Sequence, residues 1–100
     1  MDNWSNDRLT VVGPEEDLAR FLKSQWYRRL GARHGEMMEN FRRRHVGVFE
    51  TDEPPIEPLR KLSRRWPTLI FMLDYEVQVE PIKGLAKLSR GNLTHCQLNY

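Results

Sequence analysis

The chain contains one cysteine, Cys96, among its 100 residues. A single cysteine cannot form an internal disulfide, so the fold does not depend on an oxidising compartment. Long apolar runs are missing as well, because the longest, from Leu69 to Leu73, is far too short to span a bilayer. The first eight residues lack the apolar run of a secretory signal. These absences predict a cytoplasmic protein with no membrane segment.

Metal ligands are few and badly spaced. His34, His45, His95 and Cys96 are the only soft ligands, and no pair of them has the spacing of a zinc site. Neighbouring residues of a strand also point to opposite faces, which separates His95 from Cys96. Surface or half-buried histidines and a buried cysteine are the favoured interpretation. We therefore expect no metal site.

Catalytic patterns are also absent from the sequence, which has no Gly-rich phosphate loop, nucleophile elbow or Cys–His arrangement. Asp74, Glu76 and Glu80 do share one face of a predicted strand, and the first two would lie within ~7 Å of each other, near the spacing of paired catalytic carboxylates. That face is expected to meet solvent, where nothing desolvates a carboxylate. A solvated sheet face is favoured, so we expect no catalytic residues, no cofactor and no enzymatic activity.

The strongest pattern that is present runs from Leu69 to Glu80, where apolar residues alternate with acids and amides. Strict alternation over this length predicts one long strand with an apolar and a mostly polar face. The predicted core face comprises Leu69, Phe71, Leu73, Tyr75, Val77 and Val79. The opposite face comprises Ile70, Met72, Asp74, Glu76, Gln78 and Glu80.

Shorter patterns predict the other elements. Four further strands and two helices follow from alternation, helical spacing and turn residues. The strands are expected at 8–12, 46–51, 84–89 and 93–98, and the helices at 14–30, ending at Gly31, and at 56–66. Residues 31–45 have two glycines and no clear period, so they are expected to be irregular or to contain a short helix.

This order of elements predicts an α+β fold of the ferredoxin-like sandwich type. The sheet would be mainly antiparallel, with two helices on one face and a C-terminal hairpin. The length fits a single domain spanning residues 1–100, in which residues 31–45 form an insertion.

Three strings of the sequence resemble one protein family. They are Asn3-Trp-Ser-Asn-Asp-Arg-Leu-Thr-Val-Val-Gly-Pro14, Phe49-Glu-Thr-Asp-Glu-Pro-Pro55 and Leu62-Ser-Arg-Arg-Trp-Pro-Thr-Leu-Ile-Phe71. With the closing Gly84-Leu-Ala-Lys and Gly91-Asn-Leu93, they resemble the ferredoxin-like domain of YubB-type proteins from bacterial plasmids and phages. The resemblance implies a fold and a mobile-element setting, and it implies no activity. The chain departs from the family pattern Thr-x-Trp-x-Pro-Pro, because Thr51-Asp-Glu-Pro-Pro55 lacks the Trp and is one residue shorter.

Charge is unevenly distributed although the net charge is only +2. Residues 20–65 hold twelve of the sixteen Lys and Arg but only six of the fourteen acids. Both predicted helices must bury their apolar sides, so these cations face outward, where a basic surface would neutralise phosphates. The candidate nucleic-acid contacts are Arg42, Arg43, Arg44, Arg60, Lys61, Arg64 and Arg65, and further cations on the first helix are Arg20, Lys23, Arg28, Arg29 and Arg33.

The favoured alternative is that these cations only keep the domain soluble and pair with nearby acids, namely Glu15, Glu16, Glu36, Glu39 and Glu57. Base stacking on an open sheet, as in RNA-recognition domains, is disfavoured because the outward face of the long strand is acidic and has no aromatic side chain. The sequence therefore predicts a small non-enzymatic binding or assembly module, with phosphate-backbone binding as the alternative. Its partner would be another protein, or a second copy associating through the open sheet face around Ile70 and Met72.

Overall fold

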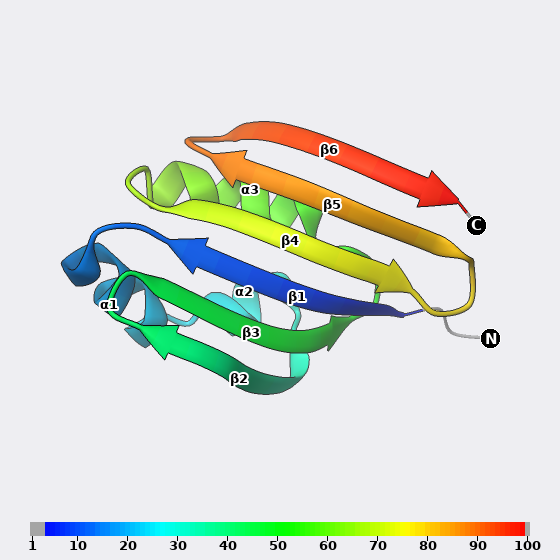
Figure 1. The fold of residues 1–100 in the computed structure, drawn as a ribbon, viewed down its shortest axis with the longest axis horizontal. Coiled ribbons are helices and arrows are strands. Elements are labelled where there is room, and N and C mark those ends of the chain that lie inside the picture. The colour runs from blue at the N-terminus through cyan, green and yellow to red at the C-terminus, as the bar shows by residue number, and fades with distance from the viewer. Residues whose placement is uncertain (1–3, 100) are drawn as a thin grey trace.

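A computed structural model describes residues 4–99, which form a six-stranded antiparallel sheet with three helices behind it (Figure 1). The strand order is β2-β3-β1-β4-β5-β6. The elements are β1 (Ser5–Val12), α1 (Glu15–Lys23), α2 (Trp26–Leu30), β2 (Arg33–Phe41), β3 (Arg44–Thr51), α3 (Ile56–Arg65), β4 (Ile70–Val77), β5 (Ile82–Ser89) and β6 (Asn92–Asn99). The predicted α+β class is thus confirmed, with three helices where the sequence indicated two.

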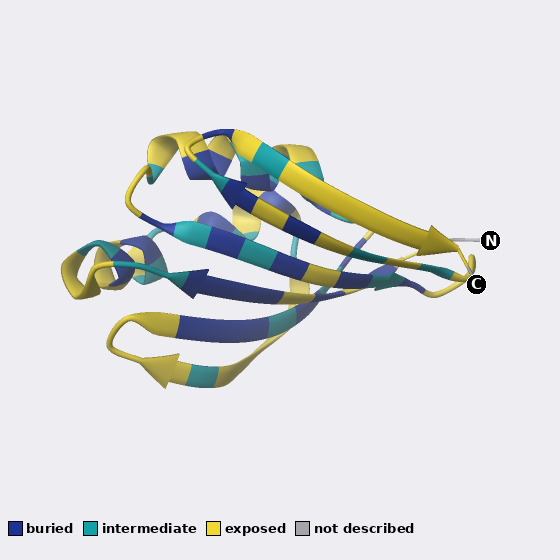
Figure 2. Cartoon of the chain, turned by 45° about the horizontal axis from the view of Figure 1, so that its top comes forward, coloured by how far each residue is buried: buried dark blue, intermediate teal, exposed yellow. Residues whose placement is uncertain are grey.

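The two central strands carry the core. β1 and β4 pair antiparallel, and this register sets Leu9 beside Leu73 and Val11 beside Phe71, all fully buried. The dark and light bands along these strands in Figure 2 follow the same alternation. The predicted core face of the long strand is therefore right as far as Val77. β4 ends there, and Val79 is 46% exposed in the following turn, so its placement in the core was wrong.

The first predicted helix is divided in two. α1 ends at Lys23, and the Ser24 hydroxyl, together with its backbone N–H, donates to the carbonyl of Phe21. This bond closes α1 early and lets α2 start in a new direction at Trp26. The Trp26 ring then stacks on Phe21 at 5.3 Å between centroids, so both rings are buried. Gly31 ends α2 in a left-handed conformation with φ +67°, as the sequence predicted.

Residues 33–41 form the edge strand β2, so the expectation of an irregular or short-helical segment was wrong. β2 pairs with β3, and its register shifts twice along its length. Nearly all its residues are exposed, including Met37, Met38 and Phe41. A strand that buries neither face shows no alternation in its sequence, which explains why the pattern was not recognised.

The predicted C-terminal hairpin is confirmed. β5 and β6 are joined by Arg90 and Gly91, whose φ angles of +53° and +80° fit a two-residue hairpin turn. The turn is fastened to α3, because the Gly91 N–H donates to the Ser63 hydroxyl at 2.8 Å and Arg60 Nε donates to the Gly91 carbonyl at 2.8 Å. The hairpin and α3 therefore form one packed unit.

Candidate functional site

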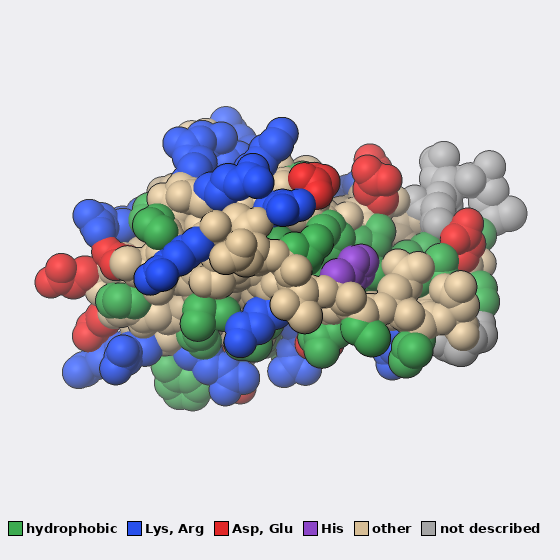
Figure 3. Space-filling model, turned by 90° about the horizontal axis from the view of Figure 1, so that it is seen from above, with side chains coloured by type: hydrophobic (Ala, Val, Ile, Leu, Met, Phe, Trp, Pro, Cys, Tyr) green, Lys and Arg blue, Asp and Glu red, His purple; other side chains and the backbone are tan. Residues whose placement is uncertain are grey.

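The exposed side of α3 is basic because its other side is committed to the core. Leu59, Leu62 and Ser63 are buried at helical spacing, which leaves Lys61, Arg64 and Arg65 exposed. Figure 3 shows Lys and Arg side chains gathered over the helix layer, at the top of that view.

A groove separates α2 from α3 on this side. One hollow of about 560 Å³ is lined by Arg29, Pro58, Lys61, Leu62, Arg64 and Arg65. An adjoining hollow of about 340 Å³ is lined by Ser24, Gln25, Arg29, Leu62, Arg65 and Trp66. Because the two hollows share Arg29, Leu62 and Arg65, we treat them as one feature, the α2–α3 groove.

The cations of the α2–α3 groove have no acidic neighbours. Within residues 4–99, no carboxylate lies within 4.0 Å of Arg29, Lys61, Arg64 or Arg65. Of the acids expected to neutralise the basic helices, only Glu57 pairs with a helix cation among residues 4–99, and that cation, Arg60, lies outside the groove lining. Glu39 pairs instead with Arg44 on β3. The groove is therefore an uncompensated positive surface.

The predicted contact residues on α3 divide into two kinds. Arg60 is a structural residue, since it binds the Gly91 carbonyl and lies 3.8 Å from Glu57. The stem of Arg64 packs over Gly91, where an added Cβ would lie 2.7 Å from Arg64 Cγ, while its head group lines the groove. Lys61 and Arg65 have no such attachment among the described residues.

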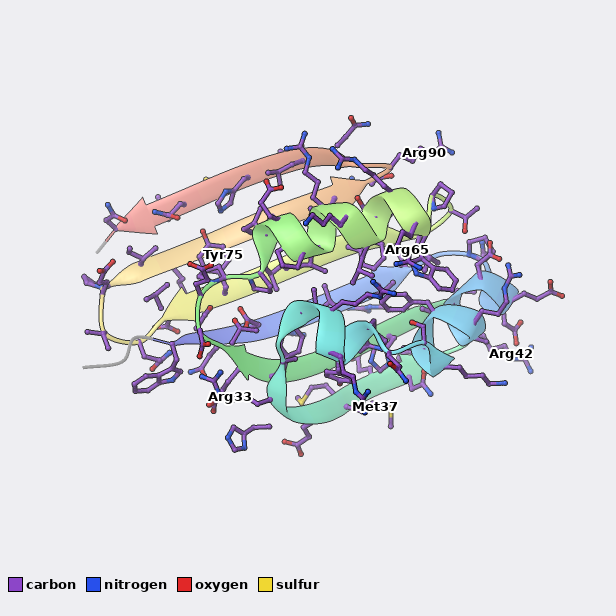
Figure 4. All side chains as sticks on the ribbon, turned by 180° about the vertical axis from the view of Figure 1, so that it is seen from behind. Arg33, Met37, Arg42, Arg65, Tyr75 and Arg90 are labelled. Carbon is purple, nitrogen blue, oxygen red and sulfur yellow. The ribbon has the colours of Figure 1, made fainter. Side chains whose placement is uncertain are left out.

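The other three candidates lie elsewhere. Arg42 and Arg43 form the β2–β3 turn, and Arg44 begins β3 and pairs with Glu39 at 3.7 Å. Figure 4 shows Arg42 beyond α1, apart from Arg65 on α3. The structure therefore does not bring the two predicted basic clusters together. It adds Arg29 from α2 to the α3 cluster, a contribution that no sequence spacing could reveal.

The open face of the sheet carries a second, larger hollow. It has a volume of about 750 Å³ and crosses the strands over Arg8, Val48, Asp74, Lys83 and Leu85. As predicted, the Asp74 side chain is exposed on this face. The apolar side chains that protrude here are Leu85 and Leu98, at 52% and 65% exposure, whereas the expected Ile70 and Met72 are half-buried. The face is of mixed charge rather than purely acidic.

One carboxylate is strongly perturbed, but it lies in the core. Burial raises the pKa of Asp7 to about 6, against hydrogen bonds from Thr51 and Ser5 that lower it. Asp7 is 2% exposed on the helix side of β1, between Phe49 and Tyr75, and these three residues also belong to the lining of the large hollow. A carboxyl group this deeply buried presents little surface to a molecule in the hollow.

The histidines of β3 and β6 have different surroundings, because His45 is buried and His95 is exposed. His45 is buried beside Trp26, with 6.3 Å between ring centroids, and burial lowers its pKa. His95 Nε2 lies 2.6 Å from the Tyr75 hydroxyl, which also donates to Gln97 Oε1 at 2.9 Å. In the part of the chain that the structure covers, no three His, Cys, Asp or Glu side chains gather as metal ligands would, and no helix has the length and apolarity to cross a bilayer.

A comparison of the chain with protein-family models, curated proteins and solved structures finds no match in any of the three. The geometry and charge of the surfaces described above are therefore the basis for inferring a function.

Proposed function

We propose that this chain is a non-enzymatic binding module that holds nucleic acid by its phosphate backbone in the α2–α3 groove. The observation that carries the proposal is a set of four cations around that groove that have no acidic partner among residues 4–99: Arg29, Lys61, Arg64 and Arg65. A cation with no carboxylate beside it can bind a phosphate without first breaking an ion pair. Three of the four are arginines, whose planar head group binds two phosphate oxygens at once.

The expected interaction is electrostatic and shows little sequence preference. Contacts to phosphate fix position without distinguishing bases. Each phosphate contact contributes about −0.7 to −0.9 to the slope of log affinity against log salt, so four contacts give a slope of about −3. The open sheet face is the weaker candidate, because Arg8 and Lys83 share its hollow with Asp74 and Glu76 and the charges there oppose one another.

The test is fluorescence anisotropy with labelled single-stranded and double-stranded DNA and RNA at low and moderate salt. The variant Lys61→Glu/Arg65→Glu reverses two cations whose side chains form no hydrogen bond or ion pair among the described residues. Its matched control, Arg42→Glu/Arg43→Glu, makes the same change in net charge at the β2–β3 turn. We expect the groove variant to lose binding and the control to retain most of it, with unchanged melting curves for both.

Two outcomes would contradict the groove assignment. Binding that survives the groove variant but is lost in the control would move the site to the β2–β3 turn. Absence of binding at ~50 mM salt, where non-specific contacts are strongest, would remove the nucleic-acid function altogether.

The second candidate function is a protein-assembly module, and the exposed Leu85 and Leu98 on the open sheet face favour it. Apolar side chains of this size beside a broad hollow are typical of surfaces that contact another protein. If no nucleic acid binds, this function stands as the alternative.

We further propose that β2, β3, β1 and β4 with the helix layer form a ferredoxin-like sandwich, extended by β5 and β6. Support comes from the connections, because helical segments link β1 to β2 and α3 links β3 to β4. With the three family-like strings, this leads us to propose a YubB-type, plasmid- or phage-associated protein of the cytoplasm.

A further inference from the structure

The outer edge of β6 is the least protected edge of the sheet. β6 pairs with β5 in unbroken register from Asn92 to Asn99, and no strand among residues 4–99 lies on its other side (Figure 1). Its sequence, Asn-Leu-Thr-His-Cys-Gln-Leu-Asn, contains no Lys, Arg, Asp, Glu or Pro. Every residue of the strand except Leu93 is exposed. Backbone donors and acceptors along such an edge are ready to pair with another strand.

The opposite edge of the same sheet is protected. β2 carries Arg33, Glu36 and Glu39, and its pairing with β3 is interrupted by two register shifts. Charges and bulges are the usual devices that prevent an edge strand from pairing with another molecule. The fold therefore guards one edge and leaves the other regular, uncharged and open.

We propose that β6 pairs with β6 of a second copy of this chain, antiparallel across a two-fold axis normal to the sheet. The charge of the strand indicates that the partner is a second copy. When a strand pairs with its own copy, like residues come close together, and β6 has no Lys, Arg, Asp or Glu that would repel its counterpart. The net charge of +2 per chain adds little long-range repulsion. The result is a continuous twelve-stranded sheet.

We take the register centred on Cys96, because it pairs residues 93–99 of one β6 with the same residues of the other, nearly the full length of the strand. On the open face it sets Cys96 opposite its own copy and Thr94 opposite Leu98; on the helix face it sets His95 opposite Gln97. Opposed Cα atoms of an antiparallel pair are roughly 4.5–5.5 Å apart, within reach of a short cross-linker. A two-fold axis normal to the sheet keeps all helices on one face, so both α2–α3 grooves point the same way. The inference does not depend on nucleic-acid binding.

Sedimentation equilibrium tests the proposal directly, and we expect wild-type protein to have twice the 12.0 kDa mass of one chain. Thr94→Lys/Cys96→Lys sets like charges against each other and should weaken the dimer by roughly 100-fold or more. The matched control Met38→Lys/Phe41→Lys adds the same charge to exposed positions of β2 and should remain dimeric. A short bismaleimide should link wild-type chains through Cys96, the sole cysteine.

Three results would overturn the proposal. The first is a monomeric wild-type protein throughout the micromolar range. The second is a dimer that the β6 lysines leave intact but that Leu85→Lys dissociates, which would assign the interface to the open sheet face. The third is a dimer in which Cys96 reacts with the bismaleimide without linking two chains.

Discussion

Asp7 and Thr51 form a chain of hydrogen bonds that indicates where a proton lies. The Thr51 hydroxyl is 2.6 Å from Asp7 Oδ2 and 2.7 Å from the carbonyl of Glu53, but it has only one proton to donate. Thr51 donates to the ionised carboxylate, and protonation of Asp7 below about pH 6 reverses this bond: the carboxyl group then donates to Thr51, and Thr51 donates to Glu53. The Ser5 hydroxyl donates to the other carboxyl oxygen at 2.8 Å. This geometry agrees with the raised pKa of Asp7, about 6, that burial produces.

Asp7 should make the protein less stable as pH rises. The folded chain holds a proton up to about pH 6 that the unfolded chain loses near pH 3.8, so the contribution of this proton is complete below pH 3.8 and is lost between the two values. The difference between the pKa values of about 6 in the folded chain and 3.8 in the unfolded chain corresponds to about 3 kcal/mol of unfolding free energy. The variant Asp7→Asn should not lose stability over this pH range. Urea melts between about pH 3.8 and pH 6 would measure the difference from wild type.

His45 should change the stability in the opposite direction with pH, so it serves as an internal control for the effect of Asp7. Burial lowers its pKa from 6.5, so its contribution to stability is lost as pH falls below that value, opposite to the effect of Asp7. The Asn variant should keep the His45 slope and lose the Asp7 slope. An Asp7→Asn variant with the same pH profile as wild type would mean that Asp7 is ionised in the fold.

At the scale of elements, a helix or strand could be predicted from the sequence when it buries one complete side. β4 and α3 each bury a complete face, through Leu73 and Leu59 among others, and their patterns in the sequence were unambiguous. β2 buries neither face and was missed. The break at Ser24 was also missed, because α1 and α2 bury the same side of the chain and the apolar spacing continues across it.

Leu73 and Asp74 of β4 test the assignment of faces. Leu73 is fully buried and Asp74 is exposed on the open side. Leu73→Ala should therefore cost about 2–5 kcal/mol of unfolding free energy through the cavity it leaves, whereas Asp74→Ala should cost under about 1 kcal/mol. Urea denaturation of the two variants would measure both values, and the reverse order would mean that the two faces have been interchanged.

The candidate site could also be predicted from the sequence only in part. The basic side of α3 could be predicted, since the residues opposite Leu59 and Leu62 had to face outward. The groove could not, because it depends on α2 turning at Ser24 to place Arg29 beside Arg65. Sequence spacing also could not show that Arg60 binds the backbone of Gly91.

The whole molecule is a sheet with protected central strands and two different edges. β1 and β4 each have strands on both sides, whereas β2 and β6 have one neighbour each among the described elements. Stability against local opening is therefore expected to be lowest at the edges, where fewer contacts and more solvent-exposed backbone bonds hold a strand.

Amide hydrogen exchange should report this distribution and its change on dimerisation. β1 and β4 should exchange slowest, and β2 should exchange fast at every protein concentration because its exposed strand gains no partner. β6 should exchange fast in dilute protein and more slowly as concentration rises. Mass spectrometry of peptides covering the two edges would measure both rates, and a concentration effect on β2 instead would contradict the assignment.

The difference between the two edges also determines where growth of an assembly stops. A strand edge that accepts further copies at both ends of a sheet would extend into a filament, since each added molecule would present a new edge. In the proposed dimer, each β6 edge is covered by its two-fold partner, and the strand left outward at each end is β2, with Arg33, Glu36, Glu39 and its two register shifts. If the proposed dimer forms, the irregular strand β2 would therefore stop further strand addition and limit the assembly to two chains.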